Sequence, residues 1–141
     1  NTYRDREINC ILDSTIRRYP VEPLWLMAGD FNSYSPKDAD AMPANTYFET
    51  HSIVLKSGYC DALRDRHSQF FHTVPTPYNG ESTADQRRID FIYASQAVMR
   101  EITDSRIIYD EFTATHSDHY PVMIEFLHYP SGKQASGVAL K

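Results

Sequence analysis

Three short segments of the 141-residue chain each contain an aspartate, and two of them add an amide or an imidazole group. They are Gly29-Asp30-Phe31-Asn32, Arg88-Ile89-Asp90-Phe91 and Ser117-Asp118-His119-Tyr120-Pro121. Each adjoins a stretch that we predict to be a strand, and a rigid sheet can hold side chains within the tolerances that chemistry requires. Singly, each segment also has an ordinary explanation as a turn, an ion pair or a cap. In combination, they contain the groups that hydrolysis of a phosphate ester requires.

This reaction needs a hard cation, a group that takes a proton from water, and donors to the phosphoryl oxygens. Asp118 offers an oxygen ligand suited to Mg²⁺ or Mn²⁺, and His119 beside it is an imidazole that can act as a base near neutral pH. Asp90 is the candidate that holds His119 in the productive tautomer. Asp30 and Asn32, two residues apart, can share one site as an acid or water-positioning carboxylate and as an amide donor to phosphate.

The composition indicates one globular domain. Charged residues make up 23% and hydrophobic residues 41% of the chain, which argues against disorder. No apolar run approaches the roughly 18 residues of a membrane helix, so we predict no membrane span. The formal net charge of -5 has the wrong sign for a protein that coats nucleic acid through charge alone. The arginines stand mostly in separated pairs, Arg17-Arg18, Arg64 with Arg66, and Arg87-Arg88.

The two cysteines, Cys10 and Cys60, lie far apart and match no metal-ligand spacing. We expect buried free thiols or a single disulfide, without a catalytic role. They leave the cellular compartment open.

Hydrophobic periodicity and breaker residues predict a mixed α/β layout of about five strands and two or three helices. In the strand that holds the second segment, Ile89, Phe91 and Tyr93 alternate onto one face, which places Asp90 on the other. The short apolar run 24–28 is typical of a strand buried on both faces. The predicted elements are helices over 3–19 and 45–57, strands over 24–28, 70–74, 88–94, 106–109 and 122–126, and loops over 33–44 and 75–86.

The three segments resemble, in order and spacing, the C-terminal motifs of the DNase I-like endonuclease/exonuclease/phosphatase superfamily. The resemblance covers residues from about 1 to 127. It implies that Asp30 and Asn32 contact the attacking water, the leaving group and the phosphoryl oxygens. It also implies that Asp90 is the partner of the histidine, that Asp118 binds the metal, and that His119 is the base or stabilises the transition state. The implied activity is Mg²⁺- or Mn²⁺-dependent hydrolysis of a phosphodiester or phosphomonoester by activated water.

The same resemblance implies that residues 1–129 are the C-terminal half of a four-layer α-β-β-α sandwich, with 130–141 as a polar tail. Members of the superfamily have an N-terminal half that supplies a metal-binding glutamate. A half sandwich exposes the apolar inner face of its sheet, which soluble monomers rarely tolerate. We therefore expect the N-terminal half of the same domain, a swapped copy or a second polypeptide to cover this face. The isolated chain is expected to be inactive.

Other functions are compatible with parts of the pattern. The main alternative is a non-catalytic binding or scaffold module of the same fold, although each C-terminal motif position retains its chemical type. A serine hydrolase built from Ser117, His119 and Asp90 would lack the Gly-x-Ser-x-Gly turn. A zinc site made of His116, Asp118 and His119 would need adjacent residues to converge on one ion.

The motifs do not identify the phosphate ester, which can be nucleic acid, a phospholipid head group or a sugar phosphate. Residues 73–87, with Tyr78 and the Arg87-Arg88 pair, are the candidate substrate-facing loop, and a plain solvent loop is an equally good interpretation. Arg88 is also a candidate structural partner of a carboxylate. The histidines outside the motifs are expected at the surface or in packing: His51, His67, His72 and His128.

Overall fold

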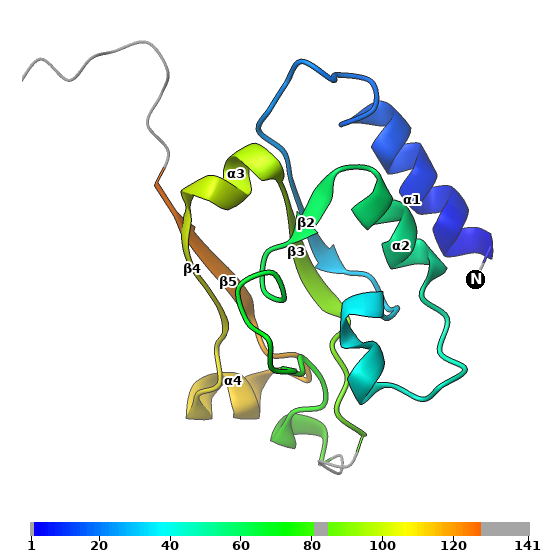
Figure 1. Ribbon diagram of the computed structural model, residues 1–141. Coiled ribbons are helices and arrows are strands. Elements are labelled where there is room, and N and C mark those ends of the chain that lie inside the picture. Colours follow the sequence, from blue (N-terminus) through cyan, green and yellow to red (C-terminus); the bar gives the residue numbers. More distant parts are fainter. Residues whose placement is uncertain (1, 81–84, 128–141) are drawn as a thin grey trace, which may run out of the picture.

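The computed structural model describes residues 2–80 and 85–127 of the chain (Figure 1). The predicted polar tail over 130–141 and His128 lie outside these residues. The helices are α1 (Thr2–Ser14), α2 (Glu49–Lys56), α3 (Gln96–Glu101) and α4 (Glu111–His116), with the 3-10 helices η1 (Pro36–Ala41) and η2 (Pro77–Asn79). The strands are β1 (Leu26–Asp30), β2 (Tyr59–Asp61), β3 (Asp90–Ser95), β4 (Ile102–Ile107) and β5 (Val122–Phe126).

The first sheet is antiparallel and has the strand order β1-β3-β2. The helices α1 and α2 lie side by side next to it (Figure 1). Ile8 and Leu12 of α1, Val54 of α2, and Phe91 and Tyr93 of β3 form the main buried cluster. The predicted alternation along 88–94 is confirmed, because Phe91 and Tyr93 are buried whereas Asp90 and Ile92 are only half-buried.

The second sheet consists of β4 and β5, paired antiparallel, and β5 also contacts β3. Apolar residues of α3 and β4 pack against β3 in a second cluster around Ala94, Val98 and Ile102. Tyr120, which precedes β5, packs with Leu63 and Ile107 in a third cluster. The segment that contains His119 is thus held between the two sheets.

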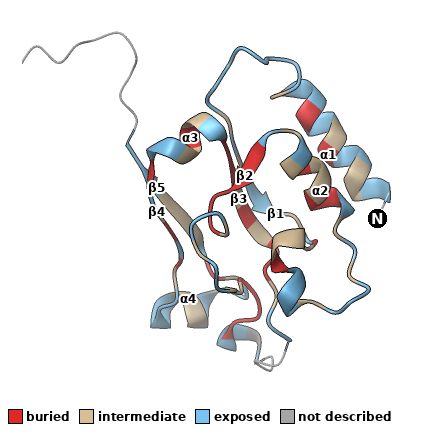
Figure 2. Cartoon of the chain, in the orientation of Figure 1, coloured by how far each residue is buried: buried red, intermediate tan, exposed pale blue. Residues whose placement is uncertain are grey.

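The prediction of a strand buried on both faces is wrong for β1. Leu26 is 43% exposed, and Met27 is the one half-buried residue of the strand. Figure 2 shows the exposed colour on β1. Met27 packs against the buried cluster that includes Ile8 and Leu12 of α1. Within residues 2–80 and 85–127, only β3 pairs with β1, and the rest of its surface stays open.

Several boundaries differ from the predicted ones. The first helix ends at Ser14 and continues as hydrogen-bonded turns to residue 18. The second begins at Glu49 and ends before Gly58, whose φ of 95° suits glycine, as expected. Residues 70–74 form no strand, only an isolated bridge between Val74 and Arg87. The sequence interpretation missed β2, which has three residues, and the helices α3 and α4. A helix of six residues makes fewer than two turns, too few to show helical periodicity.

The cysteines form no disulfide. Cys60 is buried as predicted, whereas Cys10 is exposed on α1. Burial raises the pKa of the Cys60 thiol, which keeps it protonated and unreactive. None of the helices in the described part of the chain has the length and apolar character needed to cross a bilayer.

Candidate active site

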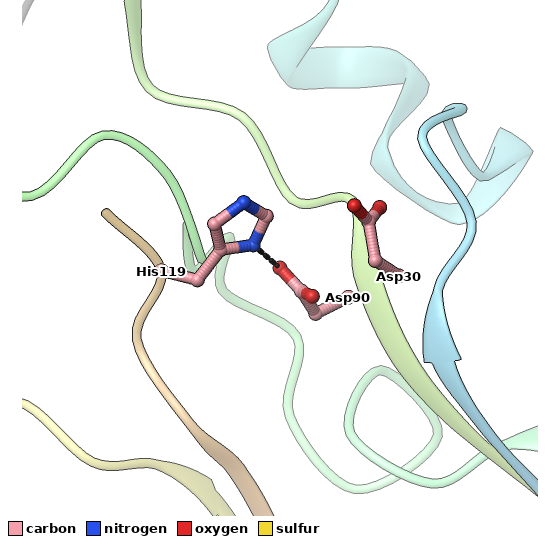
Figure 3. A group of neighbouring side chains, drawn as sticks. All are labelled: Asp30, Asp90 and His119. Carbon is pink, nitrogen blue, oxygen red and sulfur yellow. Dashed lines mark hydrogen bonds and ion pairs between the residues drawn. The ribbon is translucent and has the colours of Figure 1, made fainter. Parts of the chain in front are cut away.

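Asp90 and His119 form the centre of the candidate site. His119 Nδ1 lies 2.8 Å from Asp90 Oδ2, and the two side chains are 31% and 19% exposed, respectively. Asp30 joins them because β1 and β3 pair in a register that places Asp30 opposite Asp90. Figure 3 shows the hydrogen-bonded pair with Asp30 beside it. One ligand atom from each of the three residues lies within 4.8 Å of the others, so the group is compact enough to share a cation or a water molecule.

The end of β1 forms a tight turn that holds the Asp30 carboxylate. Asp30 Oδ1 accepts a hydrogen bond of 2.7 Å from the backbone N–H of Asn32. Asn32 has a φ of 47°, in the left-handed region that asparagine tolerates better than most residues. The backbone N–H of Phe31 donates to the Ile89 carbonyl, which continues the pairing of the two segments. The Gly-Asp-Phe-Asn sequence therefore fits this turn by its local chemistry.

Thr73 connects the strand of Asp90 to the segment of His119. The buried Thr73 hydroxyl oxygen accepts hydrogen bonds from the backbone N–H groups of Ile89 and Asp90, at 3.0 and 3.3 Å. The Thr73 carbonyl accepts one of 2.8 Å from the N–H of Tyr120. One residue outside the three motifs thus fixes the spacing between the two catalytic candidates. Sequence reasoning missed Thr73, since a single threonine in a loop carries no pattern.

The three side chains line a pocket of about 490 Å³ between the ends of β1, β3 and β5 and the helix α4. No lysine or arginine lines it within the described part of the chain, whereas two aspartates do. An anionic phosphate would therefore meet uncompensated negative charge unless a cation binds with it. Asn32 lines a neighbouring pocket that shares Gly29 and Asp30 with the first. Its predicted contact with phosphate stays a prediction.

Asp118 is exposed and lies outside the compact group of Asp30, Asp90 and His119. Its predicted role as metal ligand is therefore untested by the geometry. Among the described residues, His116, Asp118 and His119 do not form a group close enough to share an ion, which argues against the zinc site. The Ser117 hydroxyl accepts the backbone N–H of His119, and the imidazole Nδ1 bonds Asp90, an arrangement unlike that of a serine nucleophile.

Arg88 is a structural residue, so its prediction as part of a substrate-facing arginine pair is wrong. Its side chain is 1% exposed and bonds both oxygens of Asp61, at 2.9 and 2.6 Å, and Asp38 at 2.7 to 2.8 Å. Burial works to lower the pKa of the guanidinium, but the bonds and charges of the two aspartates raise it. Arg87 is half-exposed and pairs with Asp85 at 3.4 Å. The alternative prediction, that Arg88 is partner to a carboxylate, is confirmed.

His51 belongs to a buried hydrogen-bond network beside the site. The Ser33 hydroxyl donates to the Phe31 carbonyl, so its oxygen accepts the proton of His51 Nε2 at 2.8 Å. His51 Nδ1 then accepts from the Tyr93 hydroxyl at 2.6 Å. Burial, followed by the charge of Arg88, lowers the pKa of His51 to about 4. The neutral ring is thus a packing residue, as expected, and supports the turn that follows β1.

We expect this buried histidine to make folding stability depend on pH. Its pKa of 6.5 in the unfolded chain falls to about 4 on folding, so the unfolded state binds more protons between these values. Stability is complete above pH 6.5 and decreases as the pH falls toward 4, by about 3 kcal/mol in all. Urea unfolding at several pH values measures this loss. The His51→Gln variant should lack that part of the slope, and an identical slope in both proteins would contradict the assignment.

Comparison with solved structures places the chain in a known fold class. A 3′ phosphatase, NExo, from Neisseria, bound to a product DNA hairpin, superposes with a TM-score of 0.70 at 21% identity over 90% of this chain and 54% of its own. The 3′-5′ exonuclease NExo from Neisseria meningitidis gives a TM-score of 0.68 at 22% identity, over 89% and 54%. An AP endonuclease from Archaeoglobus fulgidus gives 0.66 at 18%, over 89% and 52%. No family model and no curated protein sequence matches the chain.

The chain therefore has the DNase I-like α/β fold, which confirms the fold that the three motifs predicted. It spans about half the length of the solved structures that it matches, in agreement with half of a sandwich. At these identities the likeness concerns the fold. By their names, the three matched proteins are phosphatase or nuclease enzymes, and the first is bound to a product DNA hairpin.

Proposed function

We propose that the chain carries the C-terminal half of the active site of a metal-dependent phosphoesterase. The observation that carries the proposal is the Asp90–His119 pair with Asp30 across the strand register, in a pocket at the end of the sheet. A hydrogen-bonded carboxylate and imidazole beside a second carboxylate is an arrangement that general-base hydrolysis uses. The phosphatase and nuclease names of the solved structures support the same class of reaction.

In this proposal each side chain has one role. His119 takes a proton from the attacking water, and Asp90 keeps the imidazole oriented through its bond to Nδ1. Asp30, exposed at the end of β1, positions the water or protonates the leaving oxygen. Asn32 donates its amide to a phosphoryl oxygen. The water attacks phosphorus directly, and the P–O bond to the leaving group breaks without a covalent enzyme intermediate.

The donor set fits a hard divalent cation such as Mg²⁺ or Mn²⁺. The available donors are mostly carboxylate oxygens, and no lysine or arginine in the described lining balances a phosphate. Asp118 and a glutamate outside this chain would hold the ion, which supplies neutralisation of the charge that develops on the phosphoryl oxygens. We propose that an N-terminal half of the domain, or a swapped copy, contributes this glutamate. The same segment would cover the open face of β1.

Removal of divalent cations should abolish hydrolysis by the full-length protein. Without a cation, two aspartates face the phosphate in the pocket, so we expect a loss of at least ~10²-fold after dialysis against EDTA. Addition of Mg²⁺ or Mn²⁺ in excess over the chelator should restore the rate. Release of phosphate from a 3′-phosphorylated DNA end is a suitable assay. A rate that EDTA leaves unchanged would contradict the metal-dependent mechanism.

A further inference from the structure

Helix α4 presents a stacked pair of aromatic rings to the candidate site. Phe112 is 68% exposed, and its ring lies nearly parallel to that of His116, with the centroids 4.2 Å apart and an angle of 14° between the planes. His116 Nδ1 lies 2.9 Å from the Phe112 carbonyl oxygen, so its N–H donates to that oxygen and holds the imidazole in place. The rings therefore form a flat surface of defined orientation.

The helix below the rings is held firmly despite its six residues. Asp110 and Thr113 form a reciprocal capping box at its start, and the Thr113 hydroxyl also lies 3.1 Å from the Ile108 carbonyl. Ala114 packs against the buried cluster that includes Tyr120. A surface that is rigid before binding loses little entropy when a ligand orders on it. This helix is thus suited to present a contact surface.

Phe112 and His116 line the same pocket as Asp30, Asp90 and His119. An exposed aromatic side chain costs free energy in water, and convergence of apolar and polar groups in one pocket is typical of ligand sites. Within residues 2–80 and 85–127, the solvent-exposed surface of the Phe112 side chain does not contribute to the packing of the fold. Because Phe112 lines the pocket of the catalytic candidates, a bound substrate can supply contacts to this surface.

We propose that Phe112, supported by His116, stacks on the nucleobase next to the scissile phosphate. In this proposal the substrate is the end of a nucleic-acid strand. The inference rests on the proposed phosphoesterase function. Both rings and the catalytic candidates share one pocket of about 490 Å³, which is large enough for a nucleotide. A nucleobase offers the planar π face that parallel aromatic rings bind best.

Charge supports a nucleobase contact over binding through the phosphate backbone. The chain has a net charge of -5, and no arginine or lysine lines the described pocket. Within the described pocket we therefore expect affinity for a nucleic-acid end to come from base stacking, together with the cation at the phosphate. Stacking on aromatic side chains tolerates any base sequence, so we expect little sequence preference.

The test is the affinity of the full-length protein for a DNA hairpin with a short 3′ overhang that ends in a phosphate. The His119→Ala background prevents turnover, and fluorescence anisotropy of a labelled hairpin gives Kd. Replacement Phe112→Ala should raise Kd about 5- to 150-fold, the range for loss of one base–aromatic stack. Phe112→Trp should retain the affinity, whereas Phe112→Leu should lose most of it. With an abasic tetrahydrofuran as the terminal nucleotide, all four proteins should bind with similar Kd.

Tyr3→Ala is the matched control, because Tyr3 is 76% exposed on α1 and does not line the pocket. It should leave Kd unchanged. The inference would be overturned if the Phe112→Ala change left Kd for the base-containing hairpin unaltered. Full affinity of the Phe112→Leu protein for the hairpin would mean that the contact needs no aromatic ring, and this result also overturns the inference. Phosphate release by the protein with His119 intact tests the proposed function separately, since stacking does not require turnover.

Discussion

The His119→Ala variant of the full-length protein should lose at least ~10²-fold in kcat for phosphate-ester hydrolysis, with KM little changed. A loss of that size is the usual contribution of a general base, and His119 is the one imidazole bonded to a carboxylate in the described pocket. Its side chain is partly exposed and packs in none of the buried clusters, so folding should be retained. Initial rates over a range of substrate concentrations separate kcat from KM.

Two variants make this result specific. Asp90→Asn keeps the shape of the side chain but removes the charge that orients the imidazole, so kcat should fall while KM stays near its original value. His67→Ala removes a histidine that bonds the Ser105 carbonyl and does not line the pocket, so kcat should be unaffected. Turnover that survives in the His119 variant would remove this residue from the mechanism. Absence of hydrolysis by the unaltered full-length protein would favour a non-catalytic module.

Replacement of Arg88 by methionine should destabilise the fold by about 3–5 kcal/mol, the largest stability effect that we expect for a single change. Arg88 is the shared partner of Asp38 and Asp61, and all three side chains are at most 2% exposed. Methionine fills a similar volume but leaves Asp61 buried without its cation and Asp38 with Arg64 alone, at 3.0 Å. Burial already raises the pKa of Asp38, which shows how weakly this environment solvates a charge.

Urea unfolding monitored by circular dichroism measures this effect, and Arg87→Met is its control. Arg87 is the neighbouring residue, and its ion pair with Asp85 is largely exposed, so its replacement should cost less than about 1 kcal/mol. Equal destabilisation by the two changes would mean that the buried network contributes no more than a surface pair. The network matters for the site because Arg88 stands two residues before Asp90, and its guanidinium lies 4.3 Å from the Phe91 ring centroid.

Much of the fold was predictable where sequence patterns are long or local. Alternation along 88–94 and 122–126 identified the strands that carry Asp90 and follow His119. The Gly-Asp-Phe-Asn turn was predictable because its hydrogen bond joins residues two apart. The short elements β2, α3 and α4 gave no usable pattern, and with α4 the sequence interpretation missed Phe112 as a pocket residue.

The sequence by itself determined the residue types of the candidate site, the order of its three segments and the fold class to which they belong. Only the tertiary structure decided which of these groups meet: Asp30, Asp90 and His119 converge, whereas Asp118 stays outside their group. It also assigned Arg88 to the core, because Asp38 and Asp61 reach it from elements 50 and 27 residues away. Contacts at such separations depend on strand register and packing, which no local pattern of residues encodes.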